Sequence, residues 1–368
     1  MIKNFFSKVK ILSKIKFRFD FPSSKKILLF DETHSESLKK IIKKNFNILK
    51  VRSEKEIYFW IFFKQIVYFD FKFMTYCKNY IKFLSPKIVI TFIDTNREFY
   101  ELKNFFKKIN FISIQDGCRV EKNTMFYNKS YIKTEKLKCD HSFVFNEYYI
   151  EEYQRIIKSN YHVLGNFKNN LIQINRKKRN KNFLFISQYS KNHKRNLRFI
   201  KKLANLINLY LSRSNKKIYI LLRYKEAFRQ NEEINFYKKI FQSKCIFKRN
   251  THYKKSYELI DEFENIIFLY STLGFEAIAR KKKVAIFSPI KNFDGTLNFA
   301  WPAPYQKKYN FFSSKNLTYR EVKRVLDNIN NCSQSNWNKK YYNSIKDQLH
   351  FDKNNEKLRN LIIQLIKI

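Results

Sequence analysis

Glycine and proline are scarce in this chain, which has only 4 Gly and 5 Pro among 368 residues. This scarcity excludes collagen-like and Gly/Pro-rich disordered proteins, and each glycine should stand where the backbone requires one. Hydrophobic residues make up 44% of the chain, which is enough to build cores and argues against global disorder. The length favours two domains over one.

Several motifs that mark common enzyme classes are missing as well. The absence of a Walker P-loop, a Gly-x-Gly-x-x-Gly fingerprint and a Gly-x-Ser-x-Gly elbow counts against ATPases, dehydrogenases and α/β-hydrolases. The five cysteines are far apart and form no Cys-x-x-Cys pair, which argues against a disulfide framework or a zinc site and fits a reducing cytoplasm. No run reaches the ~18 uninterrupted apolar residues of a membrane span, and we recognise no signal peptide.

Acidic residues are outnumbered: 75 Lys and Arg against 31 Asp and Glu give a formal net charge of +44. One interpretation is an anionic partner, such as nucleic acid, anionic lipid or a phosphorylated substrate. The other is codon bias, because Lys, Asn, Ile, Phe and Tyr are all encoded by A/T-rich codons. The lysines are scattered and no RNA-binding signature stands out, so we expect no specific nucleic-acid partner.

The first residues carry apolar side chains at helical spacing with lysines between them. Such a basic amphipathic helix lies on an anionic membrane in some proteins and packs on its own domain in others, and both interpretations stay open here. The apolar positions are Ile2, Phe5, Phe6, Val9 and Leu12.

Short apolar runs alternate with helical patterns along the whole chain, which predicts βαβ units and parallel sheets. We expect an α/β protein with two Rossmann-like domains facing a cleft. The predicted boundaries are 1–165 for the first domain, 166–182 for a linker, 183–310 for the second domain and 311–368 for C-terminal helices. Strands are expected at 26–30, 46–51, 87–94, 111–115, 140–145 and 161–164, then at 183–187, 217–222, 245–248, 266–270 and 284–287, with a long aromatic helical region over 55–84.

The strongest site signal is the block Tyr-Ser-Thr-Leu-Gly-Phe-Glu-Ala-Ile-Ala-Arg at 270–280. It predicts a strand, a tight turn and a helix whose first N–H groups and dipole could bind an anion. Ser271 and Thr272 suit the N-cap, Gly274 allows close approach of a ligand, and Glu276 could bind a hydroxylated group. A well-capped helix without a ligand is the alternative.

Other candidates follow predicted parallel strands, whose carboxyl ends form the ligand edge of an open α/β sheet. Asp94 or Asp116 could serve as general base, with a helix N-cap and a turn residue as the respective alternatives. Arg223 could bind a pyrophosphate and Arg119 a phosphate or carboxylate. His34 and His252 also lie near predicted strand ends, although surface-loop positions are more frequent for such residues.

The 270–280 block resembles the donor-site motif of GT-B-fold glycosyltransferases, and most of all a family of surface carbohydrate biosynthesis proteins. Capsule Kdo transferases and CDP-glycerol glycerophosphotransferases are more distantly similar. The segments 88–96, 112–119 and 163–170 also resemble stretches of that family. Two departures are the pair Arg280-Lys281, where relatives often have glycine, and Tyr224-Lys225, where they often have a histidine.

The resemblance implies that Ser271, Thr272 and Gly274 contact the phosphates of a nucleotide-activated donor and that Glu276 contacts its nucleoside. It further implies that Gln115, Gly117 and Arg119 help to bind a glycan or lipid-linked acceptor. No Asp-x-Asp pair occurs, so we expect neither a metal ion nor another cofactor.

The sequence therefore predicts a metal-independent glycosyltransferase of bacterial surface polysaccharide or lipopolysaccharide biosynthesis that transfers a sugar or a polyol phosphate. We expect it in the cytoplasm, with a possible peripheral contact to the anionic inner membrane. A nucleotide-sugar epimerase of the same fold and a basic, non-catalytic nucleic-acid-binding protein are the alternatives.

Overall fold

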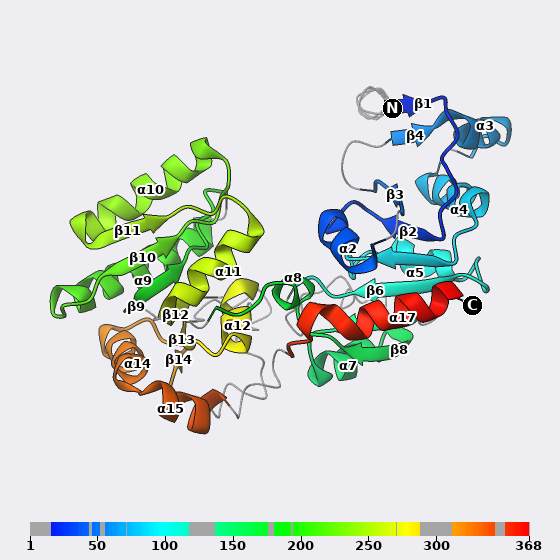
Figure 1. Ribbon diagram of the computed structural model, residues 1–368. Helices are drawn as coiled ribbons and strands as arrows, with labels where there is room; N and C mark the ends of the chain where they lie inside the picture. The colour runs from blue at the N-terminus through cyan, green and yellow to red at the C-terminus, as the bar shows by residue number, and fades with distance from the viewer. Residues whose placement is uncertain are drawn as a thin grey trace. The chain divides into compact units, whose positions relative to one another are not determined.

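The computed structural model describes residues 16–43, 46–51, 56–70, 72–117, 137–175, 180–192, 194–269, 271–287, 311–342 and 350–367. The chain divides into two compact units (Figure 1). Of the described residues, those up to Asp116, from 137 to Leu171 and from Asp352 onward form the first unit; Gly117 and those from Ile172 to Phe351 form the second. The predicted amphipathic helix at the N-terminus and the candidate Arg119 lie outside the described residues.

The first unit is built on a six-stranded, all-parallel sheet in the order β3-β2-β5-β6-β7-β8. Alternate residues of its central strands divide between the two faces, as the period of a strand requires. Ile27 and Ile88 belong to a core cluster with helices α2 and α17, whereas Phe30 and Phe111 pack against Phe99 of α5. The strands are β2 (Ile27–Phe30), β3 (Asn47–Leu49), β5 (Ile88–Thr91), β6 (Asn110–Ile114), β7 (Leu137–Val144) and β8 (Ile157–Val163), and the helices are α2 (Ser35–Ile42), α5 (Arg97–Lys103), α7 (Glu147–Tyr153), α8 (Phe167–Asn170) and α17 (Glu356–Lys367).

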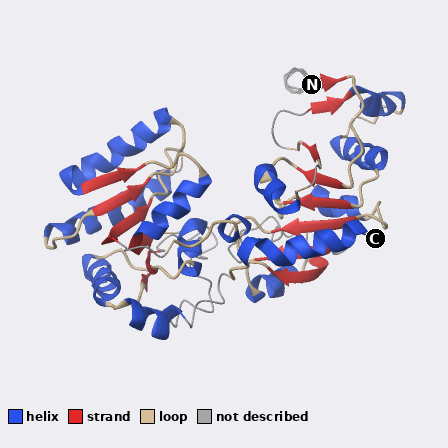
Figure 2. Ribbon diagram, in the orientation of Figure 1, coloured by secondary structure: helices blue, strands red, loops and turns tan. Residues whose placement is uncertain are grey.

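The second unit repeats the plan, with the parallel order β11-β10-β9-β12-β13-β14 (Figure 2). Its strands are β9 (Asn180–Ile186), β10 (Ile218–Leu221), β11 (Cys245–Lys248), β12 (Phe263–Phe268), β13 (Lys283–Phe287) and β14 (Ser313–Ser314). Its helices include α9 (Lys194–Ser212), α10 (Ala227–Phe241), α11 (Tyr253–Glu262), α12 (Thr272–Ala279), α14 (Tyr319–Asn331) and α15 (Gln334–Asn336). The prediction of two Rossmann-like α/β domains is confirmed.

The aromatic helical region expected over 55–84 is confirmed in part. The structure has strand β4 (Glu56–Tyr58), paired with β1 (Lys16–Arg18), and two separate helices, α3 (Phe59–Val67) and α4 (Phe73–Leu84). Asp70 breaks the pattern, because its carboxylate accepts bonds from the Lys72 N–H and the Thr75 hydroxyl at 3.1 and 2.7 Å and so organises the turn that leads into α4. No helix within the described ranges combines the length and the apolar character that crossing a bilayer demands.

The chain passes from the first unit to the second between Leu171 and Ile172, and the segment after 311 divides between the units. Two buried amides hold the returning C-terminal segment to the first unit. Asn170 donates to the Leu164 carbonyl and to Asn355, both at 2.8 Å, and Asn355 donates to the Phe167 carbonyl at 3.0 Å. Helix α17 is thereby fixed to the sheet that the N-terminal half of the chain forms.

Helix α12 ends in a Schellman motif with lysine at the position that glycine usually occupies. The N–H of Lys282 bonds to the Ala277 carbonyl and that of Lys281 to the Ile278 carbonyl. Lys281 has φ 61°, in the left-handed region that disfavours a residue with a Cβ. A lysine in this conformation adds local strain that a glycine would not.

Replacing Lys281 with glycine should therefore stabilise the protein. We expect Lys281→Gly to raise the free energy of unfolding by roughly 0.5–1 kcal/mol, since relief of the strain outweighs the entropy that glycine adds to the unfolded chain. Urea denaturation measures the change. Lys201→Gly, inside helix α9, is the control and should lower the same free energy by about 1 kcal/mol. A loss of stability in Lys281→Gly would contradict the interpretation.

Candidate functional site

The predicted donor residues Arg223 and Ser271 lie at the carboxyl edge of the second sheet. Arg223 follows β10 and Ser271 follows β12, and strand β9 lies between these two strands in the sheet. Ser271 is the N-cap of α12, but its side chain makes no capping hydrogen bond. The N-cap side chains of α5, α7 and α14, by contrast, each accept a bond from an N–H three residues on. The Ser271 hydroxyl is thus not committed to capping its own helix.

Gly274 has a packing role that the sequence did not reveal. A Cβ atom built on this residue would lie 2.2 Å from the ring of Phe268, which is fully buried on β12. Only glycine lets the first turn of α12 approach the strand this closely. The role predicted for Gly274, close approach of a ligand to the backbone, stays a prediction.

Arg223 is oriented by a buried carboxylate. Glu233 of α10 is fully buried. Both of its carboxylate oxygens accept a hydrogen bond from the backbone N–H of Arg223, each at 3.1 Å, and Oε2 also accepts the backbone N–H of Tyr224 at 3.4 Å. Burial raises the pKa of the Glu233 carboxyl above its ordinary value, although these N–H donors oppose the shift. The Arg223 side chain is exposed and donates to the Tyr189 carbonyl at 3.3 Å. The guanidinium therefore stands exposed at the sheet edge.

Two other predicted features of this unit differ from expectation. Glu276, expected to reach a hydroxylated ligand, lies in the second turn of α12, and its side chain is buried with 4% exposure. His252 is the N-cap of α11, where its Nδ1 accepts the Lys255 N–H at 3.2 Å. This histidine therefore serves its own helix.

The first sheet brings His34 and Asp116 together at its own carboxyl edge. His34 follows β2 in the left-handed conformation, with φ 62°, and its Nε2 hydrogen-bonds to Oδ1 of Asp116, which follows β6. Phe92 and Phe167 enclose the imidazole, which is 7% exposed, whereas the Asp116 carboxylate is 37% exposed. The Lys168 ammonium stands 3.9 Å from the same carboxylate oxygen. The arrangement is a surface carboxylate held from behind by a buried histidine.

Asp94 and Gln115 are buried and committed to the fold. Asp94 is 1% exposed; its Oδ2 accepts the Tyr153 hydroxyl and its carbonyl accepts the Tyr100 hydroxyl, both at 2.7 Å. The N-cap of α5 is Asn96 rather than Asp94. Gln115 accepts the Phe145 N–H at 2.9 Å. Gly117 is half-buried and follows Asp116 directly. Of the two candidate bases, Asp116 has its carboxylate at the surface and Asp94 has it in the core.

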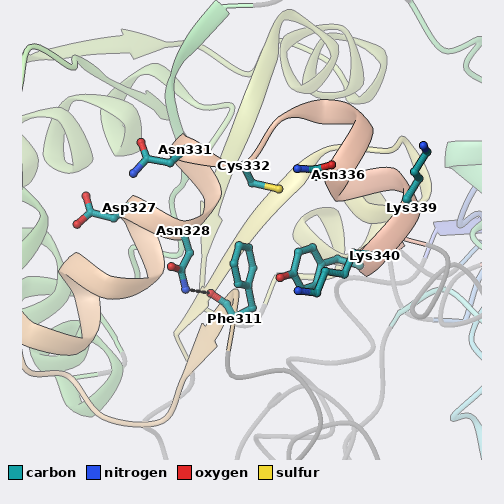
Figure 3. A pocket seen from close by; sticks show the side chains of 9 residues that line it. Phe311, Asp327, Asn328, Asn331, Cys332, Asn336, Lys339 and Lys340 are labelled. Atoms are coloured by element: carbon teal, nitrogen blue, oxygen red, sulfur yellow. Dashed lines mark hydrogen bonds between the residues drawn. The ribbon is translucent and has the colours of Figure 1, made fainter.

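A pocket of about 490 Å³ lies elsewhere on the second unit (Figure 3). The first residue of β13, Lys283, donates to the carbonyl of the lining residue Cys332 at 2.9 Å, which places the pocket at the amino ends of the strands, opposite Ser271. Within the described ranges, no group of three or more His, Cys, Asp or Glu side chains could hold a metal ion. The pocket is lined by Phe311, Asp327, Asn328, Asn331, Cys332, Asn336, Lys339, Lys340 and Tyr341.

The two α/β units, each built on a parallel sheet, have the architecture of a GT-B-like protein, as the sequence resemblance predicted. Residues 111–366 match the model of a family described as "putative O-antigen biosynthesis protein". This match spans more than half of the 368 residues, so the chain belongs to that family. No curated protein matches the sequence.

Solved structures with the same fold share little sequence with this chain. Staphylococcus aureus MnaA, solved with UDP, superposes with a TM-score of 0.55 and 12% identity over 94% of this chain and 98% of MnaA. The UDP-GlcNAc 2-epimerase of Methanocaldococcus jannaschii superposes with a TM-score of 0.54 and 14% identity over 92% of this chain and 99% of the epimerase. TarM of S. aureus gives a TM-score of 0.48 and 13% identity over 79% of this chain. The chain spans 58% of the length of TarM. Identities this low show the fold alone.

The Gly274–Phe268 contact leads to a direct prediction. Gly274→Ala should lower the free energy of unfolding by about 1–3 kcal/mol, because the added methyl group overpacks a buried ring. Chemical denaturation measures the loss. The double variant Gly274→Ala/Phe268→Leu should recover part of it, since the smaller side chain makes room. Equal stability of Gly274→Ala and the parent protein would contradict the contact.

Proposed function

We propose that the protein is a glycosyltransferase of O-antigen or related surface polysaccharide biosynthesis that transfers a sugar, or a polyol phosphate, from a nucleotide-activated donor. The observation that carries the proposal is the carboxyl edge of the second sheet, with the Ser271 N-cap and the exposed Arg223, in a chain that belongs to an O-antigen biosynthesis family. That the structure of MnaA contains UDP supports a nucleotide as the ligand of this edge.

In this proposal the second unit binds the donor. The first N–H groups of α12 and the Ser271 and Thr272 hydroxyls bind the donor phosphates, where the helix dipole favours negative charge. Arg223 neutralises the charge that develops on the departing nucleoside phosphate, in the role that a metal ion has in other transferases. Glu276 contacts the nucleoside.

The first unit activates the acceptor. Asp116 accepts the proton of the acceptor hydroxyl. At the same time the hydroxyl oxygen bonds to the donor carbon, and the bond from that carbon to the nucleoside phosphate breaks. His34 and Lys168, which contact one oxygen of Asp116, keep the carboxylate in place at the surface. Gly117 and Arg119 complete the predicted acceptor site, whereas the buried Gln115 supports the fold beneath it. A cytoplasmic location stays a prediction.

A second candidate is a nucleotide-sugar epimerase. The UDP-GlcNAc 2-epimerase of M. jannaschii is covered over 99% of its length, against 58% for TarM. In this reaction Asp116 takes a proton from the sugar ring instead of from an acceptor. Incubation with UDP-GlcNAc alone separates the candidates: an isomeric nucleotide sugar identifies an epimerase, whereas a transferase leaves the sugar configuration unchanged.

The donor site predicts a defined binding experiment. A thermal-shift screen with CMP-, CDP-, UDP-, GDP- and dTDP-linked sugars and polyols should show stabilisation by one nucleotide class, worth about 2.7 kcal/mol at 100 times Kd. Arg223→Gln should weaken that affinity about tenfold or more, because a hydrogen bond to a charged group contributes roughly 1.5–3 kcal/mol.

Arg213→Gln is the matched control for this screen, since Arg213 is an exposed arginine that leads into the amino end of β10. Its affinity should equal that of the parent protein. Stabilisation by no nucleotide, or an equal loss in both variants, would remove the donor assignment.

Replacement of Asp116 should affect turnover, whereas replacement of Asp94 should affect stability. With the donor found above and a membrane fraction as acceptor source, Asp116→Asn should lower kcat by about 100-fold or more without changing donor affinity. Asp94→Asn should instead lower the melting temperature, because the buried carboxylate and the Tyr153 hydroxyl are partners, and the folded enzyme should retain most of its turnover. The reverse pattern would assign catalysis to Asp94.

A further inference from the structure

Exposed large hydrophobic side chains are concentrated at one end of the first unit. Of the fifteen found among the described residues, ten lie between Phe17 and Phe83. They come from β1 and the segment after it, from α3 with the turn that follows, and from α4. Figure 1 draws β1, β4 and α3 beyond the β3 edge of the first sheet. We call the exposed surface of six of these aromatic residues the aromatic face. They are Phe19, Phe21, Trp60, Phe63, Tyr68 and Phe69.

The aromatic face is continuous at its centre. Phe21 stacks on Trp60 and on Phe83, with ring centroids 6.4 and 5.7 Å apart. The Trp60 indole N–H donates to the Phe19 carbonyl at 2.7 Å, so this polar group is already satisfied and the ring presents apolar surface. Trp60 and Phe63 are each close to half exposed even though they touch neighbouring rings. Packing among the described residues therefore does not bury this face.

Helix α3 is oriented with apolar residues toward solvent. Trp60, Phe63 and Val67 stand at helical spacing i, i+3 and i+7 and are 45, 46 and 58% exposed, whereas Ile61 and Gln65 face the interior. An amphipathic helix of a globular protein normally shows polar residues at such outward positions. The outward stripe of α3 is thus a surface of the kind that usually contacts a partner.

The turn after α3 holds the most exposed rings at a strained backbone position. Tyr68 is 81% and Phe69 84% exposed. Phe69 has φ 51°, a left-handed conformation that is rare for a bulky residue and that glycine adopts without strain. The Phe69 and Asp70 N–H groups bond to the Ile66 and Gln65 carbonyls, which holds the turn in place. The fold therefore accepts strain at a phenyl ring that the described residues leave largely exposed.

Basic side chains accompany the aromatic face. Lys16, Lys64 and Lys82 are exposed on β1, α3 and α4, and Lys64 lies one helical turn from Trp60. The neighbouring carboxylates are engaged: Asp20 pairs with Arg18, and Asp70 accepts bonds from Lys72 and Thr75. Aromatic rings that insert among headgroups, with lysines beside them, match the requirements of an anionic lipid surface.

We propose that the aromatic face docks on an anionic lipid bilayer, with Tyr68 and Phe69 inserted into the headgroup region and the lysines against lipid phosphates. A second copy is the poorer occupant, since it would bring together two chains that each carry a formal charge of +44. Single-stranded nucleic acid stacks on aromatic rings, but Ile66 and Val67 offer no ring for stacking, whereas acyl chains contact aliphatic side chains readily. The inference does not depend on the proposed function, because docking needs neither donor nor acceptor.

Vesicle flotation of the full chain tests the proposal. The protein should float with vesicles of phosphatidylglycerol and phosphatidylcholine in equal parts, more weakly with phosphatidylcholine alone, and less at high salt. The double variant Tyr68→Ser/Phe69→Gly should lower the partition coefficient at least tenfold. Glycine suits the left-handed position, so this variant should fold with an unchanged or higher melting temperature.

Phe228→Ser is the matched control, because Phe228 is 74% exposed on α10 of the second unit; it should float like the parent protein. Equal flotation of the double variant and the parent, or no flotation of either, would overturn the proposal. So would a variant that floats normally but loses binding to a 20-nucleotide single strand, or one that converts a dimer to a monomer. Donor binding by the parent protein is measured separately, so failure of docking and failure of the proposed function can be told apart.

Discussion

The contact between Gly274 and the ring of Phe268 sets the position of helix α12, because the first turn lies against β12 with no room for a Cβ atom. The other end of the helix is held by Arg280, which is fully buried and pairs with Asp261 of α11. Its remaining donors reach the Ile172 and Gln173 carbonyls at 3.1 and 3.3 Å. The helix that carries the candidate donor residues is therefore fixed at both ends.

The buried pair at Arg280 depends on complete satisfaction of its polar groups. Burying two charges costs several kcal/mol each, and the ion pair offsets this only when the other lone pairs and N–H groups are bonded as well. Here Asp261 also accepts the Asn175 N–H at 2.8 Å, and the Lys282 ammonium donates to the Asp261 carbonyl at 2.8 Å. Residues 172–175, which follow the boundary between the units, are tied by this network to α11 and α12. Arg280 is thus a structural element of the second unit.

The sequence predicted those parts of the fold that a local pattern encodes. Buried parallel strands read as continuous apolar runs, so Ile88–Thr91 was recognisable, whereas β14 is two residues long and carries no pattern. The left-handed turns at Phe69 and Lys281 were hidden because neither has glycine. The pairing of His34 with Asp116 joins residues 82 positions apart, and Glu233 lies inside a helix with no motif around it. Strand ends can be predicted; which side chains turn toward each other there is decided by packing.

Burial explains why the two candidate carboxylates, equivalent in the sequence, differ in the structure. Both follow a strand of the first sheet at its carboxyl edge, but the Tyr100 and Tyr153 hydroxyls enclose Asp94, and its carboxylate is a partner within the core. Asp116 lies above a histidine that Phe92 and Phe167 bury, so the apolar rings hold the imidazole and the imidazole holds the carboxylate. A base must combine a fixed position with access to its substrate. Of the two, Asp116 alone meets both conditions, and it does so because aromatic packing behind His34 supplies the rigidity that burial gives to Asp94.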